Sequence, residues 1–311
     1  MKKVTHKTLD EFNKYANSFA NNSKSLKINQ TRQIMASIDG FKSYQDIQRY
    51  YASKETILSN STVPVLSILS NAGGSGKTAC TSILAEYFTS FMNKKVLLVD
   101  FCSQKNLTHI FLRDVKLYED SRYPIDSIFT LLMGKSIKIH SAQVAKNTVI
   151  DIISGDERIE SITRVENNKE IIPQLLRELF SSFSTGDYDL IIVDCSCTKE
   201  MIQIMSSIST HILIPIGSSK THCIQQTMNL ISDSPAKLIG SFYTYETDED
   251  RNKFKRDKEQ IALSHLFLSD YANIVFDKAI AHQSLSDEYI FDFRRFELNC
   301  LGKAVGRHIF N

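Results

Sequence analysis

The segment Val65-Leu-Ser-Ile-Leu-Ser-Asn-Ala-Gly-Gly-Ser-Gly-Lys-Thr78 joins a short apolar run to a glycine-rich turn. Residues Ala79–Phe88 follow the turn and favour a helix. A strand, a glycine loop, a Lys-Thr pair and a helix, in this order, are the context of a phosphate-binding loop. The strict pattern G-x-x-x-x-G-K-[ST] is not met, because Asn71 stands at its first glycine. The alternative interpretation is an ordinary glycine-rich turn with an exposed lysine.

The residue types in this loop suit a nucleotide. Glycines let successive backbone N–H groups converge on phosphate oxygens, and the start of the following helix adds positive potential. Lys77 is expected to neutralise the β- and γ-phosphates, and the hydroxyl of Thr78 to bind Mg²⁺. The residues expected to contact the nucleotide are Gly73, Gly74, Ser75, Gly76, Lys77, Thr78 and Ala79.

The rest of the chain repeats short apolar runs between longer amphipathic segments. Continuous apolar strands separated by segments of helical length indicate a parallel sheet that is covered on both faces. We therefore predict an α/β fold with a doubly wound, mostly parallel sheet. The predicted strands are Val65–Leu69, Lys95–Val99, Val149–Ile153, Leu190–Val193, His211–Pro215, Leu238–Phe242 and Ile274–Phe276.

Composition excludes several classes of protein. The 311 residues are 42% hydrophobic and 23% charged, as in an ordinary globular chain. With 11 Gly and 5 Pro, collagen-like and Gly/Pro-rich disordered structures are excluded. The basic start has no apolar region after it, and no apolar run approaches the roughly 20 residues that span a bilayer. We expect a cytoplasmic protein with no membrane association. The net charge of +2 does not by itself indicate a nucleic-acid partner.

The chain also shows a boundary near Asn60–Pro64. Before it, Phe12, Tyr15, Ala16 and Phe19 form a one-sided apolar stripe at helical spacing. We predict a helical N-terminal extension over residues 1–60 and a nucleotide-binding domain over residues 61–311. The extension is basic, and a DNA-reading or a dimerising role are both open, since no helix-turn-helix is legible in it.

Two predicted strands end in a carboxylate. Lys95-Val-Leu-Leu-Val-Asp100 is one, and Tyr188-Asp-Leu-Ile-Ile-Val-Asp194 is the other. The carboxyl ends of parallel strands are where such folds bind ligands. Asp194 is expected to hold Mg²⁺ through water, as a Walker B residue does. The alternative for each aspartate alone is a helix cap or a turn residue.

With these motifs in place, the chain resembles the ParA/MinD family of deviant Walker (P-loop) ATPases, and partition proteins in particular. Ala72–Thr78 is similar to the family's K-G-G-x-G-K-T. Asp100–Thr108 is similar to D-x-D-P-Q-G-N-L-T, and Asp194-Cys-Ser-Cys197 to D-C-P-P. His211–Pro215 and Ile280–Glu288 match weaker family segments, the second near the adenine pocket. The resemblance implies ATP and Mg²⁺ as cofactors and roles in turnover for Lys77 and Asp100.

The departures from the family pattern are equally specific. The signature lysine, which the resemblance places across an ATP-sandwich dimer, falls on Ala72. The second Asp of D-x-D, which is associated with hydrolysis, falls on Cys102. Alanine carries no charge to stabilise the transferred phosphoryl group, and a thiol is a poor proton acceptor unless its pKa is depressed. We therefore expect nucleotide binding with slow or absent hydrolysis.

Two further features have alternative interpretations. Cys102, Cys195 and Cys197 fall at site strand ends, and either form a redox or soft-metal cluster or are simply small buried residues. The basic residues Arg251, Lys253, Lys255, Arg256 and Lys258 form either a solvated helix face or a surface for non-specific DNA. Arg294, Arg295, Lys303 and Arg307 are candidates for the same surface.

The expected function is that of an ATP-binding, ParA-like partition protein. The resemblance implies a homodimer with ATP, association with DNA and the nucleoid, and a ParB-like centromere-binding partner in plasmid or chromosome segregation. The alternative is a non-hydrolysing, nucleotide-sensing adaptor that acts through protein–protein contacts. A relative that positions a secretion or surface apparatus is also open, because the motifs do not identify the cargo.

Overall fold

The computed structural model describes residues 63–112, 126–145, 148–165, 168–183, 186–217, 223–245, 274–275 and 295–310, together with residues 13 and 44–45. The chain divides into two compact units, Met1–Thr62 and Val63–Asn311. Within the first unit, the hydroxyl of Tyr44 donates to Oδ1 of Asn13 at 2.7 Å. The rest of the predicted helical extension lies outside the described residues.

In the described part of the second unit the strands form one sheet, in the order β3-β4-β2-β5-β1-β6-β7-β8. Every neighbouring pair is parallel except β3 with β4. This confirms the predicted doubly wound, mostly parallel α/β fold, and each of the seven predicted strands is present. The strands are β1 Val65–Ile68, β2 Val96–Phe101, β3 His140–Ala145, β4 Thr148–Ile153, β5 Leu190–Cys195, β6 His211–Gly217, β7 Lys237–Tyr245 and β8 Ile274–Val275.

The sequence analysis missed β3. This strand lies at the edge of the sheet, antiparallel to β4, and its residues alternate between buried and exposed, with Ala142 and Val144 buried and Ser141 and Gln143 exposed. Such alternation is typical of a strand with one solvated face. The continuous apolar runs that mark the central parallel strands are therefore absent from β3.

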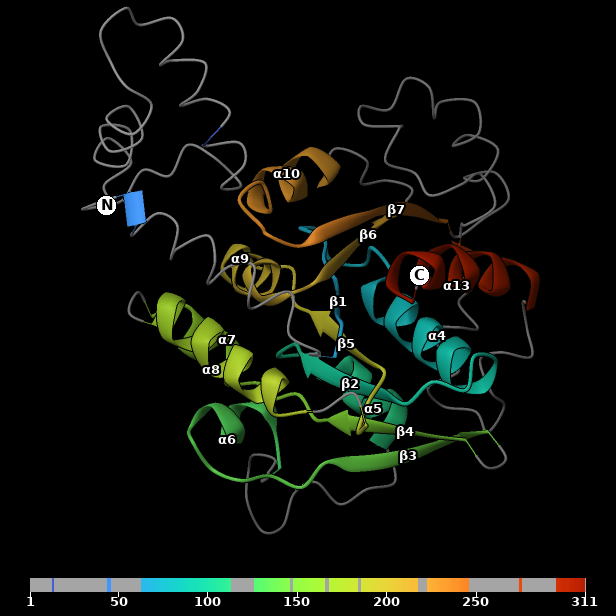
Figure 1. Cartoon of the computed structure of the whole chain (residues 1–311), viewed down its shortest axis with the longest axis horizontal. Helices are drawn as coiled ribbons and strands as arrows, with labels where there is room; N and C mark the ends of the chain where they lie inside the picture. Colours follow the sequence, from blue (N-terminus) through green and yellow to red (C-terminus); the bar gives the residue numbers. More distant parts are fainter. Residues whose placement is uncertain are drawn as a thin grey trace, which may run out of the picture. The chain divides into compact units, whose positions relative to one another are not determined.

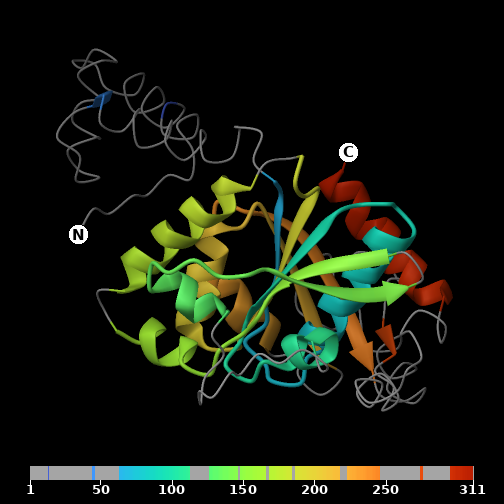
Figure 2. The same ribbon diagram turned by 90° about the horizontal axis from the view of Figure 1, so that it is seen from below.

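Two layers of helices cover the sheet (Figures 1 and 2). Alternate residues of each central strand point to opposite faces, so that Leu97 and Val99 of β2 join one hydrophobic core while Val96 and Leu98 join the other. One layer contains α4 Lys77–Ser90, α5 Asn106–Leu112 and α13 Arg295–Ile309. The other contains α6 Ile128–Leu132, α7 Ile159–Thr163, α8 Asn168–Ser182, α9 Lys199–Ile208 and α10 Cys223–Leu230.

The strand order brings three chemically important strand ends together. β5 lies between β1 and β2, and Asp194 is the register partner of both Ile68 and Asp100. The glycine loop after β1 and the aspartates at the ends of β2 and β5 therefore meet at one edge of the sheet. Among the described residues, no helix has the length and apolar character needed to cross a membrane.

Candidate nucleotide-binding site

The glycine-rich turn forms the loop between β1 and α4, and two of its glycines have left-handed backbone angles. φ is 65° at Gly74 and 85° at Gly76. Gly76 is the N-cap of α4, and a Cβ atom there would lie 2.9 Å from Cγ2 of Thr244. Both the φ angle and the lack of space therefore favour glycine at position 76. The first N–H groups of a helix lack intrahelical acceptors, so this loop presents donors suited to phosphate.

A hydrogen bond also links the loop to β7, through a residue that the sequence analysis did not name. The buried hydroxyl of Thr244 donates to the carbonyl oxygens of Ser75 and Ile216, at 3.1 and 3.2 Å. These contacts tie the phosphate-binding loop to the ends of β6 and β7. Thr244 comes long after the loop in sequence, and no motif marks it.

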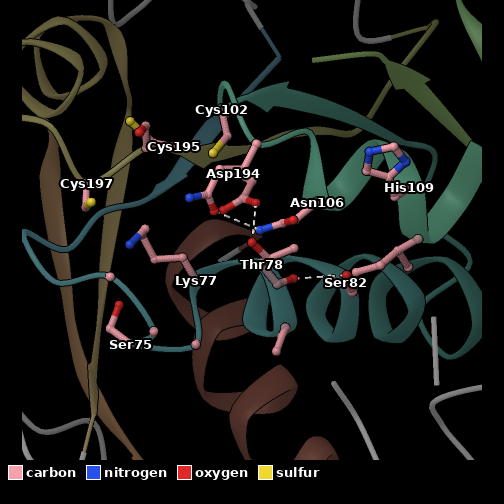
Figure 3. Close-up of a pocket in the computed structure, with 17 residues that line it drawn as sticks. Ser75, Lys77, Thr78, Ser82, Cys102, Asn106, His109, Asp194, Cys195 and Cys197 are labelled. Atoms are coloured by element: carbon pink, nitrogen blue, oxygen red, sulfur yellow. Dashed lines mark hydrogen bonds between the residues drawn. The ribbon is translucent and has the colours of Figure 1, made fainter. Parts of the chain in front are cut away.

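Lys77 and Thr78, the first two residues of α4, each contact a partner within the site (Figure 3). The ammonium of Lys77 donates to the carbonyl oxygen of Ala72 at 2.8 Å. The hydroxyl of Thr78 donates to Oδ2 of Asp194 at 2.6 Å. The predicted Walker A and Walker B residues are thus in direct contact.

Asp100 and Asp194 form a buried pair of carboxyl groups. Burial raises the pKa of both groups, and the charge of Asp194 raises that of Asp100 further. Hydrogen bonds from Thr108 to Asp100 and from Thr78 to Asp194 offset only part of this effect. Oδ1 of each aspartate is buried and has no hydrogen-bond partner among the described residues. A nearby cation would stabilise both charged forms.

This donor set fits Mg²⁺. The ion prefers hard oxygen ligands and usually keeps several waters, binding proteins through one or two carboxylates and a nucleotide phosphate. The hydroxyl oxygen of Thr78 and Oδ1 of Asp194, which accepts no hydrogen bond within the described part of the chain, are oxygen ligands of this kind. Thr78 and Asp194 would hold the ion, and Asp100 lies beside Asp194 as a second buried carboxylate.

Asp100 is fixed by residues from two other segments. Its Oδ2 accepts hydrogen bonds from the backbone N–H of Thr108 at 2.8 Å and from the Thr108 hydroxyl at 2.6 Å. The same hydroxyl accepts from the N–H of Gly155 at 2.8 Å. Asp100 is fully buried and is not among the residues that line the cavity above it. The sequence placed Asp100 at the site, but did not indicate Gly155.

A cavity of about 410 Å³ lies over the loop. Its lining includes all seven residues expected to contact nucleotide, as well as Asp194 and Cys102. Ser82, Asn106, His109 and Ile110 also line it and were not named as site residues, although Asn106 lies within the Asp100–Thr108 motif. Figure 3 shows His109 of α5 on the opposite side of the cavity from Cys197. These four residues come from α4 and α5, whose proximity the sequence alone does not reveal.

The two departures from the family pattern that we link to turnover lie at the site. Ala72 is buried, and its carbonyl oxygen accepts the hydrogen bond from Lys77. Cys102 lines the cavity, where burial and then the nearby charge of Asp100 raise its pKa to about 12. The Cys102 thiol therefore stays protonated at neutral pH and does not replace a carboxylate as a proton acceptor.

The other cysteines near the site do not form a metal-binding cluster among the described residues. Cys195 and Cys197 line the cavity, and Cys80 is buried in α4. Burial raises the pKa of Cys80 and of Cys195 well above the ordinary value for a thiol. Within the described ranges, no group of three or more His, Cys, Asp or Glu side chains could hold a metal ion. Cys80 and Cys195 are small buried thiols, whereas Cys197 is partly exposed in the cavity lining.

Several predicted features lie outside the described residues. These are the basic run Arg251–Lys258, Arg294 and the segment Ile280–Glu288. Lys303 and Arg307 are exposed, one turn apart on α13. On the same helix, Gly302 and Gly306 pack against Tyr87, Phe88 and Met92.

Comparison with known proteins identifies the family of the chain. A family model described as an AAA domain matches residues 63–236, which is more than half of the chain. The chain belongs to this ParA/MinD-like family of P-loop ATPases. A search of curated protein sequences found no match.

Solved structures of similar fold include other members of the ParA group. pNOB8 ParA bound to nonspecific DNA is 21% identical, with a TM-score of 0.58 over 80% of this chain and 99% of that one. A plasmid partition protein from Borrelia burgdorferi bound to AMPPNP is 18% identical, with a TM-score of 0.61 over 79% and 100%. Cobyrinic acid a,c-diamide synthase from Mycobacterium smegmatis, with an ATP analogue and magnesium, is 19% identical, with a TM-score of 0.51 over 64% and 82%. At these identities the likeness establishes the fold.

Proposed function

We propose that this chain is an ATP-binding, ParA-like partition protein in which Mg²⁺ and ATP favour a homodimer that associates with DNA. The observation behind this proposal is the contact between Thr78 and Asp194 beneath a glycine loop that ends in Lys77. The residues that would bind phosphate and Mg²⁺ are largely kept, whereas Ala72 and Cys102 replace two groups linked to turnover. Nucleotide occupancy then acts as a switch whose reversal by hydrolysis is slow.

Each residue has a defined task in this proposal. Gly73, Gly74, Ser75, Gly76 and Ala79 surround the phosphates, and Lys77 leaves the Ala72 carbonyl to neutralise them. Thr78 and Asp194 would hold Mg²⁺, and Asp100 supports them. When bound, the ion neutralises charge on the phosphate oxygens. Lys77 and Asp100 are the groups we assign to any residual turnover.

The proposal of DNA association and segregation rests on the family and on the sequence. pNOB8 ParA binds nonspecific DNA, and this chain has the basic run Arg251–Lys258. We propose that this run contacts DNA phosphates, that a ParB-like centromere-binding protein modulates the bound state, and that the protein acts in the cytoplasm on the nucleoid. Phosphate contacts make such binding weaken steeply with salt.

One experiment tests the core of the proposal. ATP affinity and steady-state hydrolysis are measured on the full chain, with and without Mg²⁺ and DNA, alongside the molar mass in solution. Tight, Mg²⁺-dependent binding with little turnover and an ATP-dependent dimer is the expected result. Lys77→Ala abolishes binding, whereas Lys135→Ala, at an exposed lysine that does not line the cavity, leaves it unchanged. Absence of ATP binding by the wild-type chain contradicts the proposal.

Ala72 and Cys102 favour a second candidate, a non-hydrolysing adaptor whose output is contact with another protein. The two candidates are distinguished by measuring how much of the ATP-bound chain is retained on nonspecific DNA at increasing salt concentrations. Neutralising Lys253, Lys255 and Arg256 lowers retention if the chain is a partition protein. If ATP-bound chain shows no retention at low salt, the adaptor is supported.

A further inference from the structure

One carboxylate joins the two loops that follow β2 and β5. The hydroxyl of Ser103 donates to Oε1 of Glu160 at 2.5 Å, and the hydroxyl of Ser196 donates to the same oxygen at 3.0 Å. Ser103 lies on the loop after Asp100, and Ser196 lies on the loop after Asp194. Glu160 therefore connects the segments that carry both buried carboxylates of the site.

Hydrogen bonds fix the start of the helix that carries Glu160. It belongs to α7, whose first residue donates its N–H to the carbonyl oxygen of Asp156 at 3.1 Å. The buried carboxylate of Asp156 accepts two side-chain hydrogen bonds from Arg158, at 2.6 and 2.8 Å, and one from Ser127 at 2.8 Å. The base of α7 thus has a fixed position from which Glu160 can hold the two loops.

The two serines replace prolines of the family pattern. Ser103 stands at the proline of D-x-D-P-Q, and Ser196 at the first proline of D-C-P-P. Proline fixes φ near −65°, so it restricts a loop without any side-chain partner. Serine leaves φ free but offers a hydroxyl, and here both hydroxyls bind one carboxylate oxygen. Hydrogen bonding therefore supplies a restraint that the proline rings would otherwise provide.

We propose that Glu160 is a positioning residue that clamps the loops after Asp100 and Asp194 and so holds the Mg²⁺-binding side of the site in register. This rests on the proposed function, since it concerns the same nucleotide site. In the described part of the chain, the side-chain hydrogen bonds of Glu160 go to Ser103, Ser196 and Arg164, and none reaches the glycine loop. The clamp should therefore affect the contribution of Mg²⁺ to ATP binding, and leave phosphate binding by the loop itself unchanged.

The test measures ATP affinity by calorimetry on the full chain, with Mg²⁺ and with EDTA. Glu160→Ala is expected to lower the enhancement by Mg²⁺ about tenfold, since it removes two hydrogen bonds to a charged group. Affinity in EDTA stays within about twofold of wild type, since phosphate binding in EDTA relies on the loop. Glu160→Gln keeps an oxygen that accepts from both serines, so it retains most of the enhancement. Arg164→Ala, which removes the exposed partner of the second oxygen, has no effect.

A double variant tests the clamp without changing α7. Ser103→Ala with Ser196→Ala is expected to match Glu160→Ala, and adding Glu160→Ala to it causes no further loss, because residues of one network are not additive. If Glu160→Ala does not fold, the clamp is tested by comparing the Mg²⁺ enhancement of ATP affinity in this double variant and in Glu160→Gln. Equal losses with Mg²⁺ and with EDTA, or no loss at all, overturn the clamp while the proposed function stands. A wild-type chain that does not bind ATP overturns both.

Discussion

Gly155 lies directly against Asp100. A Cβ atom at position 155 would stand 2.8 Å from the carboxyl carbon of Asp100 and 2.9 Å from the carbonyl oxygen of Cys102. Real Cβ atoms essentially never approach other atoms so closely. The turn after β4 therefore has to lack a side chain for the buried carboxylate to keep its hydrogen bonds with Thr108.

Replacing Gly155 by alanine is expected to weaken both stability and nucleotide binding. The added methyl group must displace Asp100 or the loop, and such overpacking costs about 1–3 kcal/mol. In a domain of this size that lowers Tm by several degrees, roughly 2–4 °C for each kcal/mol. Thermal unfolding and ATP calorimetry measure the two effects. Gly217→Ala is the control for the change in stability, because its Cβ would meet no atom closer than 3.5 Å. Equal Tm values for the two variants would contradict the expectation.

Thr78→Val should remove the dependence of ATP affinity on Mg²⁺. The substitution keeps the shape of the side chain but deletes the hydroxyl that donates to Asp194 at 2.6 Å. Loss of a hydrogen bond to a charged group corresponds to about tenfold or more in affinity. Thr78→Ser keeps the hydroxyl and serves as the matched control. Titration with ATP at several Mg²⁺ concentrations measures this dependence. An unchanged Mg²⁺ dependence of ATP affinity in the valine variant would show that Thr78 does not hold the ion.

Restoring the family residues should raise turnover. In a variant with Ala72→Lys and Cys102→Asp, a cation and a proton acceptor return to the positions associated with hydrolysis. A single positioned acid or base contributes about 10²–10⁴-fold, so a steady-state rate at least tenfold above wild type is a conservative expectation. Ala72→Met and Cys102→Asn provide side chains of similar size without charge. If these neutral variants turn over ATP as fast as the charged ones, the charges at positions 72 and 102 do not control the rate of hydrolysis.

The hydrogen bonds of the Asp156 carboxylate should stabilise the fold at neutral pH and less so in acid. Burial alone raises its pKa, but the hydrogen bonds from Arg158 and Ser127 outweigh burial and leave the pKa below its ordinary value. The charged form is therefore favoured by folding, and this contribution is present above the ordinary pKa, near 4, and lost as pH falls through the lowered value. Asp156→Asn should cost about 2 kcal/mol at neutral pH and make stability less dependent on pH below about 4.

Urea unfolding of this variant at several pH values measures the effect. Asp233→Asn, at an exposed aspartate, is the control for the loss of one carboxyl group. An Asp156→Asn protein that loses stability on acidification as steeply as wild type would contradict the prediction.

The sequence revealed those parts of the site that lie on one continuous segment. The loop from Gly73 to Thr78 could be predicted because its glycines, lysine and threonine are adjacent in the chain. Asp100 and Asp194 could be predicted because each ends an apolar strand, and parallel strands align their ends. The central sheet followed from the same apolar runs.

The residues that complete the site could not be predicted, because they act through contacts between distant segments. Gly155 is one of 11 glycines, and only its approach to Asp100 distinguishes it. Glu160 resembles any charged residue in a short helix until the serines of two other loops are placed beside it. β3 was missed because its alternating pattern differs from that of the central strands.

The bond between Thr244 and Ser75 has a consequence for synthesis of the protein on the ribosome. The glycine loop emerges early, but its hydrogen-bond partner Thr244 lies on β7, and Asp194, the partner of Thr78, lies on β5. The nascent chain therefore has no complete nucleotide site until β7 has left the exit tunnel. Even residues 63–236, the part that matches the family model, end before Thr244. Under the proposed function, ATP would therefore act as a folding ligand only late in translation, when nearly the whole sheet is available to assemble.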